Sequence, residues 1–254
     1  MNVIVITGAS SGIGMEFAMQ MDNYFSTVDE FWLVARSRDK LKEVARVLTH
    51  KTRVFAIDVT DKSKLDTLEA ELHEKDAVVR ILVNCAGYGL LGPFADLDRE
   101  RALGMIRLNC EALTDVTSRL IPFMRKNSRI IQLASSAAFL PQPDFAVYAA
   151  SKAYVLSFSR ALGSELKRRG IYVTSVCPGP VNTPFFDIAE KGGQILAVKK
   201  FTMVNAAKVV SLALKDSYHK RSISVCSVPI KAFRVAAKVV PHGVLLWMLE
   251  SIEI

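Results

Sequence analysis

Residues 3–14 read Val3-Ile4-Val5-Ile6-Thr7-Gly8-Ala9-Ser10-Ser11-Gly12-Ile13-Gly14. The β-branched run predicts a buried strand, and the pattern that follows the glycines predicts a helix. A strand, a glycine-rich turn and a helix in this order are typical of a loop that holds the phosphates of a dinucleotide. Gly8 permits the tight turn, Gly12 lets the backbone approach the pyrophosphate, and Gly14 lets helix and strand pack closely. Because a helix N-terminus offers free N–H groups to phosphate, we expect the contacts to come from Gly8, Ser10, Ser11, Gly12, Ile13 and Gly14.

Strand-like and helix-like segments alternate along the rest of the chain. Short β-rich runs lie at 3–6, 31–35, 53–57, 81–84, 129–134, 172–176 and 222–225. Helical patterns lie between them at 13–21, 38–49, 62–75, 99–125, 146–169 and 206–218. This alternation predicts an α/β fold, a doubly wound, Rossmann-type sheet of seven parallel strands with helices on both faces.

Composition excludes several classes of protein. The chain has 254 residues, half of them apolar, and a net charge of +8 from 33 Lys and Arg against 25 Asp and Glu. The basic residues are scattered rather than interleaved with aromatics, so nucleic acid is a poor candidate partner. An anionic cofactor or a membrane surface would each use part of this charge.

Four cysteines lie far apart in apolar runs, and neither a Cys-x-x-Cys pattern nor a histidine spacing suited to a metal is present. We therefore expect no metal site and reduced, buried thiols, which indicates a cytoplasmic protein. No signal peptide is apparent at the start, because Met1-Asn2 leads straight into the β-branched run. The apolar segment at 239–249 is interrupted by Pro241-His242-Gly243 and is too short to span a bilayer.

The end of the second predicted strand indicates which dinucleotide binds. Enzymes that use NAD generally place an acid there to bind the ribose 2′-hydroxyl. Here Ala35 occupies that position, and Arg36 and Ser37 follow it. Because a guanidinium suits a 2′-phosphate through charge-assisted bonds, we expect NADP(H), bound in part by Arg36 and Ser37. The alternative is that Arg36 and Arg38 are ordinary solvated residues at the start of a helix.

Tyr148-Ala149-Ala150-Ser151-Lys152 places a phenol and an ammonium four residues apart in a segment with a helical pattern. Side chains at i and i+4 share a helix face. A nearby positive charge favours the phenolate, so we expect Lys152 to lower the pKa of Tyr148 and make it a general acid and base. The spacing alone is common by chance, and two ordinary helix residues are the alternative.

With both elements in place, the chain resembles the classical short-chain dehydrogenase/reductase family over about residues 1–226. The glycine loop and the Tyr148/Lys152 pair match that family's motifs, and Ser135 precedes Tyr148 by the family's spacing. The remaining matches are Asp58-Val59, Asn84-Cys85-Ala86-Gly87 with Cys85 in place of a second Asn, Asn109, and Pro178-Gly179-Pro180-Val181-Asn182-Thr183.

The resemblance implies roles for these residues. Ser135 and Tyr148 would hydrogen-bond a substrate carbonyl, Lys152 would also bind the nicotinamide ribose, and Asn109 would hold a water beside Lys152. Ser136 adjoins Ser135 and is the alternative catalytic hydroxyl, although the spacing favours Ser135. Further cofactor contacts would come from Asp58, Val59, Asn84, Ala86, Gly87, Tyr148, Lys152, Pro178, Gly179, Val181 and Thr183.

The expected substrate is a small hydrophobic ketone or secondary alcohol of steroid, acyl or aryl type. Its expected wall is apolar: Tyr88, Leu90, Leu91, Phe139, Leu140, Phe145, Phe185, Phe186 and Ile188. Several of these side chains would equally serve as core. Two alternative functions remain, a 3-ketoacyl-thioester reductase and a non-catalytic dinucleotide-binding sensor on the same fold.

These expectations divide the chain in two. Residues 1–226 would form one Rossmann-fold domain that binds the dinucleotide and carries catalysis, with a substrate loop at about 184–203. Residues 227–254 form an apolar and basic tail, for which we favour an oligomer contact or a lid over a membrane-surface segment. The expected assembly is a homodimer or homotetramer.

Overall fold

A computed structural model of the chain describes residues 1–183 and 203–252, with side chains through residue 247. Seven parallel strands form one sheet in the order β3-β2-β1-β4-β5-β6-β7. The strands are β1 (Asn2–Thr7), β2 (Glu30–Ala35), β3 (Thr52–Ala56), β4 (Val78–Asn84), β5 (Arg129–Leu133), β6 (Tyr172–Val176) and β7 (Ile223–Ser224). The predicted doubly wound sheet is therefore confirmed. Its order reverses between β1 and β4, where open α/β sheets bind their ligands.

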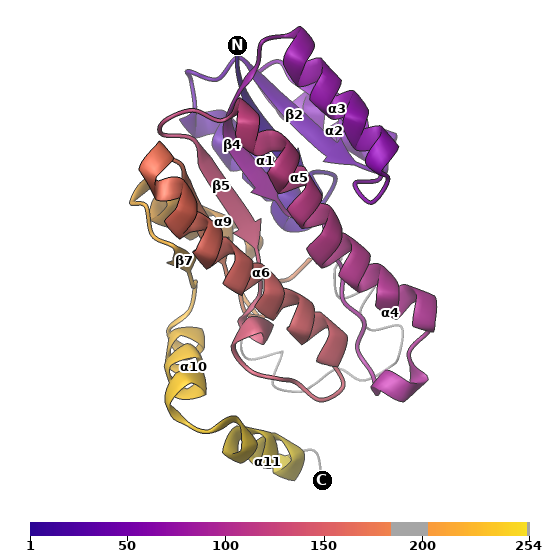
Figure 1. Ribbon diagram of the computed structural model, residues 1–254, viewed down its shortest axis with the longest axis vertical. Helices are drawn as coiled ribbons and strands as arrows, with labels where there is room; N and C mark the ends of the chain where they lie inside the picture. The colour runs from indigo at the N-terminus through magenta and orange to yellow at the C-terminus, as the bar shows by residue number, and fades with distance from the viewer. Residues whose placement is uncertain (184–202, 253–254) are drawn as a thin grey trace.

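Helices cover both faces of this sheet (Figure 1). One face carries α3 (Lys62–Glu74), α5 (Leu113–Leu120) and α6 (Ala146–Leu166). The other carries α1 (Gly12–Tyr24), α2 (Arg38–Val47) and α9 (Ala206–Tyr218). The remaining helices are α4 (Arg99–Ile106), α10 (Val228–Val239) and α11 (His242–Ile252), together with the short turns η1 (Phe94–Asp96), η2 (Arg107–Ala112), η3 (Ile121–Phe123), η4 (Ser136–Phe139) and η5 (Lys167–Arg169).

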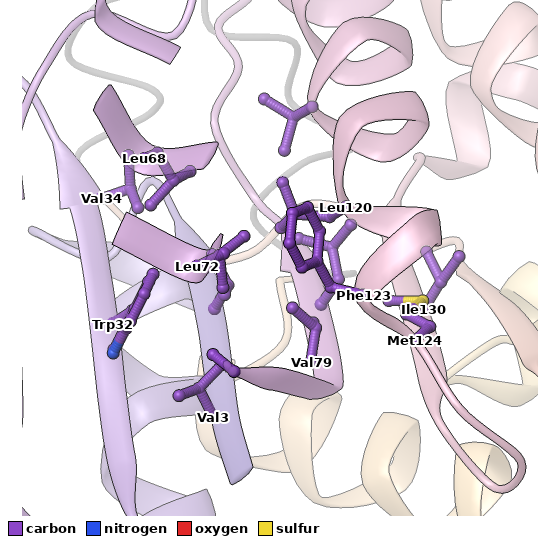
Figure 2. Close-up of a cluster of buried hydrophobic side chains, with 14 of the residues drawn as sticks. Val3, Trp32, Val34, Leu68, Leu72, Val79, Leu120, Phe123, Met124 and Ile130 are labelled. Carbon is purple, nitrogen blue, oxygen red and sulfur yellow. The ribbon is translucent and has the colours of Figure 1, made fainter. Parts of the chain in front are cut away.

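The strands are apolar at successive positions because both of their faces are covered. Side chains alternate between the two faces of a strand. Trp32 and Val34 of β2 join the core under α3 and α5 (Figure 2), whereas Phe31 and Leu33 join the core under α1 and α9. The β-branched run of β1 is divided between the two cores in the same way.

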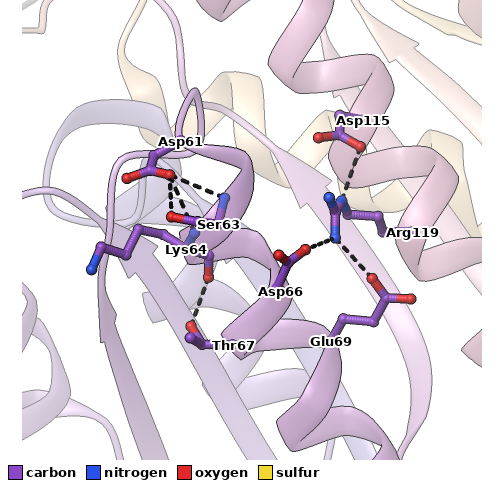
Figure 3. Close-up of polar contacts among 8 residues, drawn as sticks. All are labelled: Asp61, Ser63, Lys64, Asp66, Thr67, Glu69, Asp115 and Arg119. Atoms are coloured by element: carbon purple, nitrogen blue, oxygen red, sulfur yellow. Dashed lines mark hydrogen bonds and ion pairs between the residues drawn. The ribbon is translucent and has the colours of Figure 1, made fainter.

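Helices α3 and α5 are also held together by a surface guanidinium (Figure 3). Arg119 Nη1 lies 2.7 Å from Asp66 Oδ1 and 2.9 Å from Glu69 Oε2, both on α3. Its Nε lies 2.9 Å from Asp115 on its own helix. A network of this kind fixes the register of two helices better than an isolated surface pair would.

One predicted element is wrong. The single helix expected over 99–125 is divided into α4, the π turn η2, α5 and the 3₁₀ turn η3. Pro122 lies in the first positions of η3 and cannot donate a backbone hydrogen bond to an α-helix that continues through it. The π turn η2 contains Asn109, whose side-chain hydrogen bonds are described with the site below.

The described part of the tail forms α10 and α11, which lead away from the sheet toward the C-terminus (Figure 1). Neither these two helices nor any other in the described ranges is long and apolar enough to cross a membrane.

Candidate active site

The glycine loop leaves room where a side chain would otherwise sit. Gly8 has a φ of +67°, and a Cβ built on it would lie 2.7 Å from the main-chain nitrogen of Ala86. A Cβ on Gly14 would overlap the carbonyl oxygen of Gly8. The turn is tied to the end of β4, because Thr7 Oγ1 accepts hydrogen bonds from the N–H groups of Cys85 and Ala86 at 3.2 and 3.3 Å. The loop therefore has the close backbone approach that a pyrophosphate at the N-terminus of α1 requires.

Arg36 lies where β2 ends and is exposed. The N–H of Ala9, in the glycine loop, points to Val34 O at 3.4 Å, so the end of β2 adjoins that loop. Neither Arg36 nor Arg38 forms an ion pair with any residue that the structure describes. Ser37 is the N-cap residue of α2 and makes no side-chain cap bond. Guanidinium and hydroxyl groups are thus available beside the phosphate loop.

Three predicted cofactor residues have side chains occupied within the protein. Asn84 is buried, lies 3.4 Å from the Thr7 hydroxyl and donates to Thr117 Oγ1 at 3.0 Å. Val59 is 7% exposed and packs in the core under α3. Asp58 Oδ1 accepts from the N–H and hydroxyl of Thr60. The side chain of Asn84 therefore supports the loop that it holds in place. Val59 has only its main-chain atoms available for contact with a cofactor.

The serine and tyrosine meet at the carboxyl end of β5. Ser135 caps η4 just after that strand, Tyr148 lies in the first turn of α6, and the Ser135 hydroxyl acts to lower the pKa of Tyr148. Ser135 Oγ also accepts from the N–H of Ala137 at 3.1 Å. The main-chain N–H of the neighbouring Ser136 donates to Pro178 O at 2.8 Å. Of the two adjacent serines, Ser135 is the one whose side chain influences the pKa of Tyr148.

Lys152 is buried beside this pair. Its Nζ lies 5.6 Å from the centroid of the Tyr148 ring and donates to Leu133 O at 2.7 Å. Among the described residues no carboxylate pairs with it. The nearby thiols of Cys85, Cys110 and Cys177 raise the pKa of Lys152 slightly, but burial dominates and lowers it to about 8.

The pKa of Tyr148 differs from the sequence prediction. Burial raises it to about 12, and the hydrogen bond from Ser135 opposes this rise only in part. The expected lowering by Lys152 does not appear. Desolvation penalises the phenolate and the ammonium alike when both are buried in an apolar environment. Burial therefore favours the neutral forms of both side chains, the protonated phenol of Tyr148 and the uncharged amine of Lys152.

Asn109 is fully buried in the π turn η2. Its Nδ2 donates to Tyr88 O at 2.9 Å and to Ser151 Oγ at 3.0 Å, and its Oδ1 accepts from the N–H of Tyr88 at 3.1 Å. The side chain is thus used to hold the loop after β4, which leaves the predicted water to other atoms. A Cβ on Gly87 would lie 2.8 Å from Asn109 Oδ1 and 3.5 Å from Lys152 Nζ. Only glycine at this position therefore leaves enough room for the side chain of Asn109.

The loop at 178–183 closes over the glycine loop. Thr183 Cβ and Cγ2 lie 3.4 Å from the position of a Cβ on Gly12. Val181 pairs with Val204 through an isolated parallel bridge. Gly179 faces α10, where Ile230 Cδ1 lies 3.1 Å from the position of its missing Cβ. The predicted contacts Pro178, Gly179, Val181 and Thr183 thus all lie between the phosphate loop, Ser136 and α10.

Apolar side chains surround Tyr148. Leu90, Met105, Ala137 and Ala149 are buried with it in one cluster, and Tyr88 and Phe145 pack against that cluster. The Phe145 ring stacks on Tyr148 with centroids 4.3 Å apart. Leu140 is also buried, while Phe185, Phe186, Ile188 and most of the predicted substrate loop lie outside the described residues. Sequence reasoning missed Met105, because an apolar residue in a helical pattern carries no functional signal.

Two residues of α10 also border the site and were not predicted. Ile230 contacts the Gly179 loop, and Phe233 lies with its ring centroid 6.3 Å from that of Phe139 in η4. Only their apolar character was visible in the sequence. As for metals, no three His, Cys, Asp or Glu side chains within 1–183 and 203–252 are grouped so that they could hold one.

Comparisons with known proteins agree with this geometry. Residues 2–192 match the family described as short chain dehydrogenase. An uncharacterized oxidoreductase of Staphylococcus epidermidis is 34% identical over 219 residues, which cover 85% of this chain and 92% of the relative. A very-long-chain 3-oxoacyl-CoA reductase of Phaeosphaeria nodorum is 29% identical over 256 residues, which cover 97% of this chain and 70% of the relative. A solved short-chain dehydrogenase from Sphingobium yanoikuyae, in complex with NADPH, superposes with a TM-score of 0.79 at 26% identity and covers 96% of this chain and 95% of its own.

Proposed function

The chain belongs to the short chain dehydrogenase family and is an oxidoreductase that acts on CH–OH groups, and from that premise we propose that it is an NADP(H)-dependent enzyme for hydrophobic ketones and secondary alcohols. The observation that carries the proposal is the position of the Ser135 hydroxyl beside Tyr148, which is buried in an apolar cluster next to Lys152. Two hydroxyls that converge on one point suit a carbonyl oxygen that gains negative charge.

The nicotinamide cofactor would be held by the glycine loop, by Arg36 and Ser37 at the end of β2, and by Lys152 and the 178–183 loop. When bound it supplies or accepts the hydride. The glycine cradle and Arg36, which forms no ion pair with the described residues, support a phosphorylated dinucleotide. A related structure that carries NADPH is consistent with this choice.

The protein's own groups would handle the proton. In reduction, Ser135 and Tyr148 donate hydrogen bonds to the carbonyl oxygen, and Tyr148 transfers its proton as the alcohol forms. Burial raises the pKa of Tyr148 to about 12, so the phenol is in the protonated form that reduction requires. Lys152 lies within reach of the Tyr148 ring and titrates near pH 8, so it suits a relay that returns the proton.

The apolar cluster around Tyr148 supports a hydrophobic substrate, since a sugar would need many polar partners in the pocket. A 3-ketoacyl thioester is the second candidate, favoured by the likeness to a 3-oxoacyl-CoA reductase. A non-catalytic sensor has no need of Ser135, Tyr148 and Lys152 together.

We also propose a cytoplasmic homodimer or homotetramer, because Leu103, Ile106 and Tyr154 are about 40% exposed on α4 and α6; light scattering of the purified protein would test the assembly.

The substrate proposal is tested by reducing steroids, 3-ketoacyl thioesters and aryl ketones with NADPH while the nicotinamide absorbance is followed. We expect turnover of apolar ketones and none of free sugars. Turnover confined to polar carbonyls would contradict the proposal. If only thioesters react, the second candidate replaces the first.

The cofactor proposal is tested with Arg36→Ala. Loss of a charge-assisted bond to the 2′-phosphate should lower kcat/KM with NADPH by roughly 10- to 100-fold and leave kcat/KM with NADH nearly unchanged. Arg38→Ala, two residues further into α2, is the matched control. Comparable kcat/KM for NADH and NADPH in the unaltered enzyme would refute the NADP(H) preference.

A further inference from the structure

The faces of α10 have three different characters. Ile230, Phe233 and Ala237 are spaced by three and four residues and form its inner face. Ile230 meets Gly179, Phe233 approaches Phe139 of η4, and Ala237 is 6% exposed. This face is therefore already used to dock the helix beside the active site.

A second apolar stripe points outward. Val228, Ala232, Val235 and Val239 are spaced by four, three and four residues and so share one face. Val228 lies two residues before Ile230, which is about 200° around an α-helix, so the stripe is opposite the inner face. The three valines are 78%, 62% and 76% exposed. Such a row of large apolar side chains on an outer face usually marks a surface that another molecule covers.

Basic side chains flank this outward stripe. Lys231, Arg234 and Lys238 are spaced by three and four residues and occupy one side of α10, between the inner and outward faces. No Asp or Glu occurs anywhere between residues 217 and 249. The exposed surface of α10 thus combines apolar side chains with positive charges that no acidic residue of this segment balances. This combination is found in helices that lie on an anionic membrane.

We propose that the outward face of α10 docks on an anionic lipid surface, with Val228, Val235 and Val239 in the headgroup boundary and Lys231, Arg234 and Lys238 on the lipid phosphates. A second copy of the chain fits this face poorly. In a twofold contact the same patch meets itself, so neither chain, each with a net charge of +8, would bring acidic side chains of this segment to the basic ones of the other. Charge complementarity therefore selects lipid over the oligomer contact favoured from sequence.

This docking would place the site next to the lipid. The inner face of α10 touches η4, which begins directly after Ser135. A lipid-bound α10 thus holds the Ser135–Tyr148 pair close to the membrane surface, where apolar compounds concentrate. The docking itself does not depend on the proposed substrate, and its test needs no turnover.

The test is flotation of the full chain with vesicles of phosphatidylcholine alone or mixed with phosphatidylglycerol. Three cations near an anionic surface should strengthen binding to the mixed vesicles on the order of a hundredfold, and added salt should reverse the gain.

The variants separate lipid docking from the alternatives. Val235→Glu with Val239→Glu should abolish flotation and leave the melting temperature unchanged, because both side chains face outward. Val47→Glu on α2, also 61% exposed, is the matched control and should float as the unaltered protein does. Equal binding to both kinds of vesicle, no binding, or conversion of an oligomer to a monomer by the double variant would each overturn the proposal.

Discussion

Replacing Tyr148 by Phe lowers kcat by roughly two to four orders of magnitude, the usual share of general acid catalysis, and leaves the Kd for NADPH nearly unchanged. The variant removes only the hydroxyl. The ring keeps its stacking on Phe145 and its place beside Leu90 and Met105, so the packing around position 148 is retained. What is lost is the proton donor and the partner of Ser135.

The measurement is steady-state reduction of the best ketone, with cofactor binding followed separately by fluorescence titration. Tyr154→Phe is the matched control. Tyr154 lies on the same helix, its hydroxyl lies 2.8 Å from Thr114 Oγ1, and it is 42% exposed. That variant should keep its activity. A fully active Tyr148→Phe enzyme would remove Tyr148 from the mechanism, whereas an equal loss in both variants would point to damage in α6.

Local sequence patterns were sufficient for the fold. Strands of β-branched residues and helices of amphipathic residues depend on short-range preferences, and the parallel order follows from their alternation. The π turn η2 lies beyond such reasoning. An apolar period near 3.6 does not distinguish a continuous helix from one with an added residue, and the residue that anchors the turn, Asn109, bonds to Tyr88 and Ser151 far away in sequence.

The site was predictable as a set of residues and less so as an electrostatic environment. Spacing predicts that Ser135 and Tyr148 act together, and in the structure Ser135 influences the pKa of Tyr148; their catalytic roles remain a proposal. The pKa of Tyr148 depends on burial, which is a property of the packed chain. A Tyr and a Lys four residues apart look the same in sequence whether they lie on an exposed helix face or are buried beneath Leu90 and Phe145. Only the buried arrangement raises the pKa of the phenol.

Replacing Lys152 by Met is expected to inactivate the enzyme and to stabilise the fold. Activity should fall by roughly two to four orders of magnitude, because the proposed proton relay and ribose contact are lost together. Stability should rise because the ammonium is buried without a carboxylate partner among the described residues, and burial lowers its pKa from 10.5 to about 8. That shift in pKa corresponds to a penalty of about 3 kcal/mol for burying the charged side chain. The variant leaves the Leu133 carbonyl without its hydrogen bond from Lys152, which reduces the gain in stability by about 1 kcal/mol.

The sign of this effect depends on pH. Below about pH 8 both the folded and the unfolded chain carry the charge, and the burial penalty is present in full. Between about pH 8 and 10.5 the unfolded chain binds the proton and the folded chain does not, so the stability of the unaltered enzyme rises with pH relative to Lys152→Met. The two curves should therefore differ by about 2 kcal/mol at pH 7 in favour of the variant and converge toward pH 10, where only the Leu133 term remains to favour the lysine.

Urea unfolding of both proteins across this pH range gives the difference in their free energies of unfolding directly. The contributions of the other titrating groups cancel in that difference. Lys152→Arg is the matched control, since guanidinium remains charged throughout and should show no convergence. A Lys152→Met protein that is less stable than the unaltered enzyme at pH 7 would mean that the site stabilises the ammonium. Lys152 would then act as a permanent cation beside Tyr148, as the sequence pattern alone predicts, and its place in a proton relay would fall.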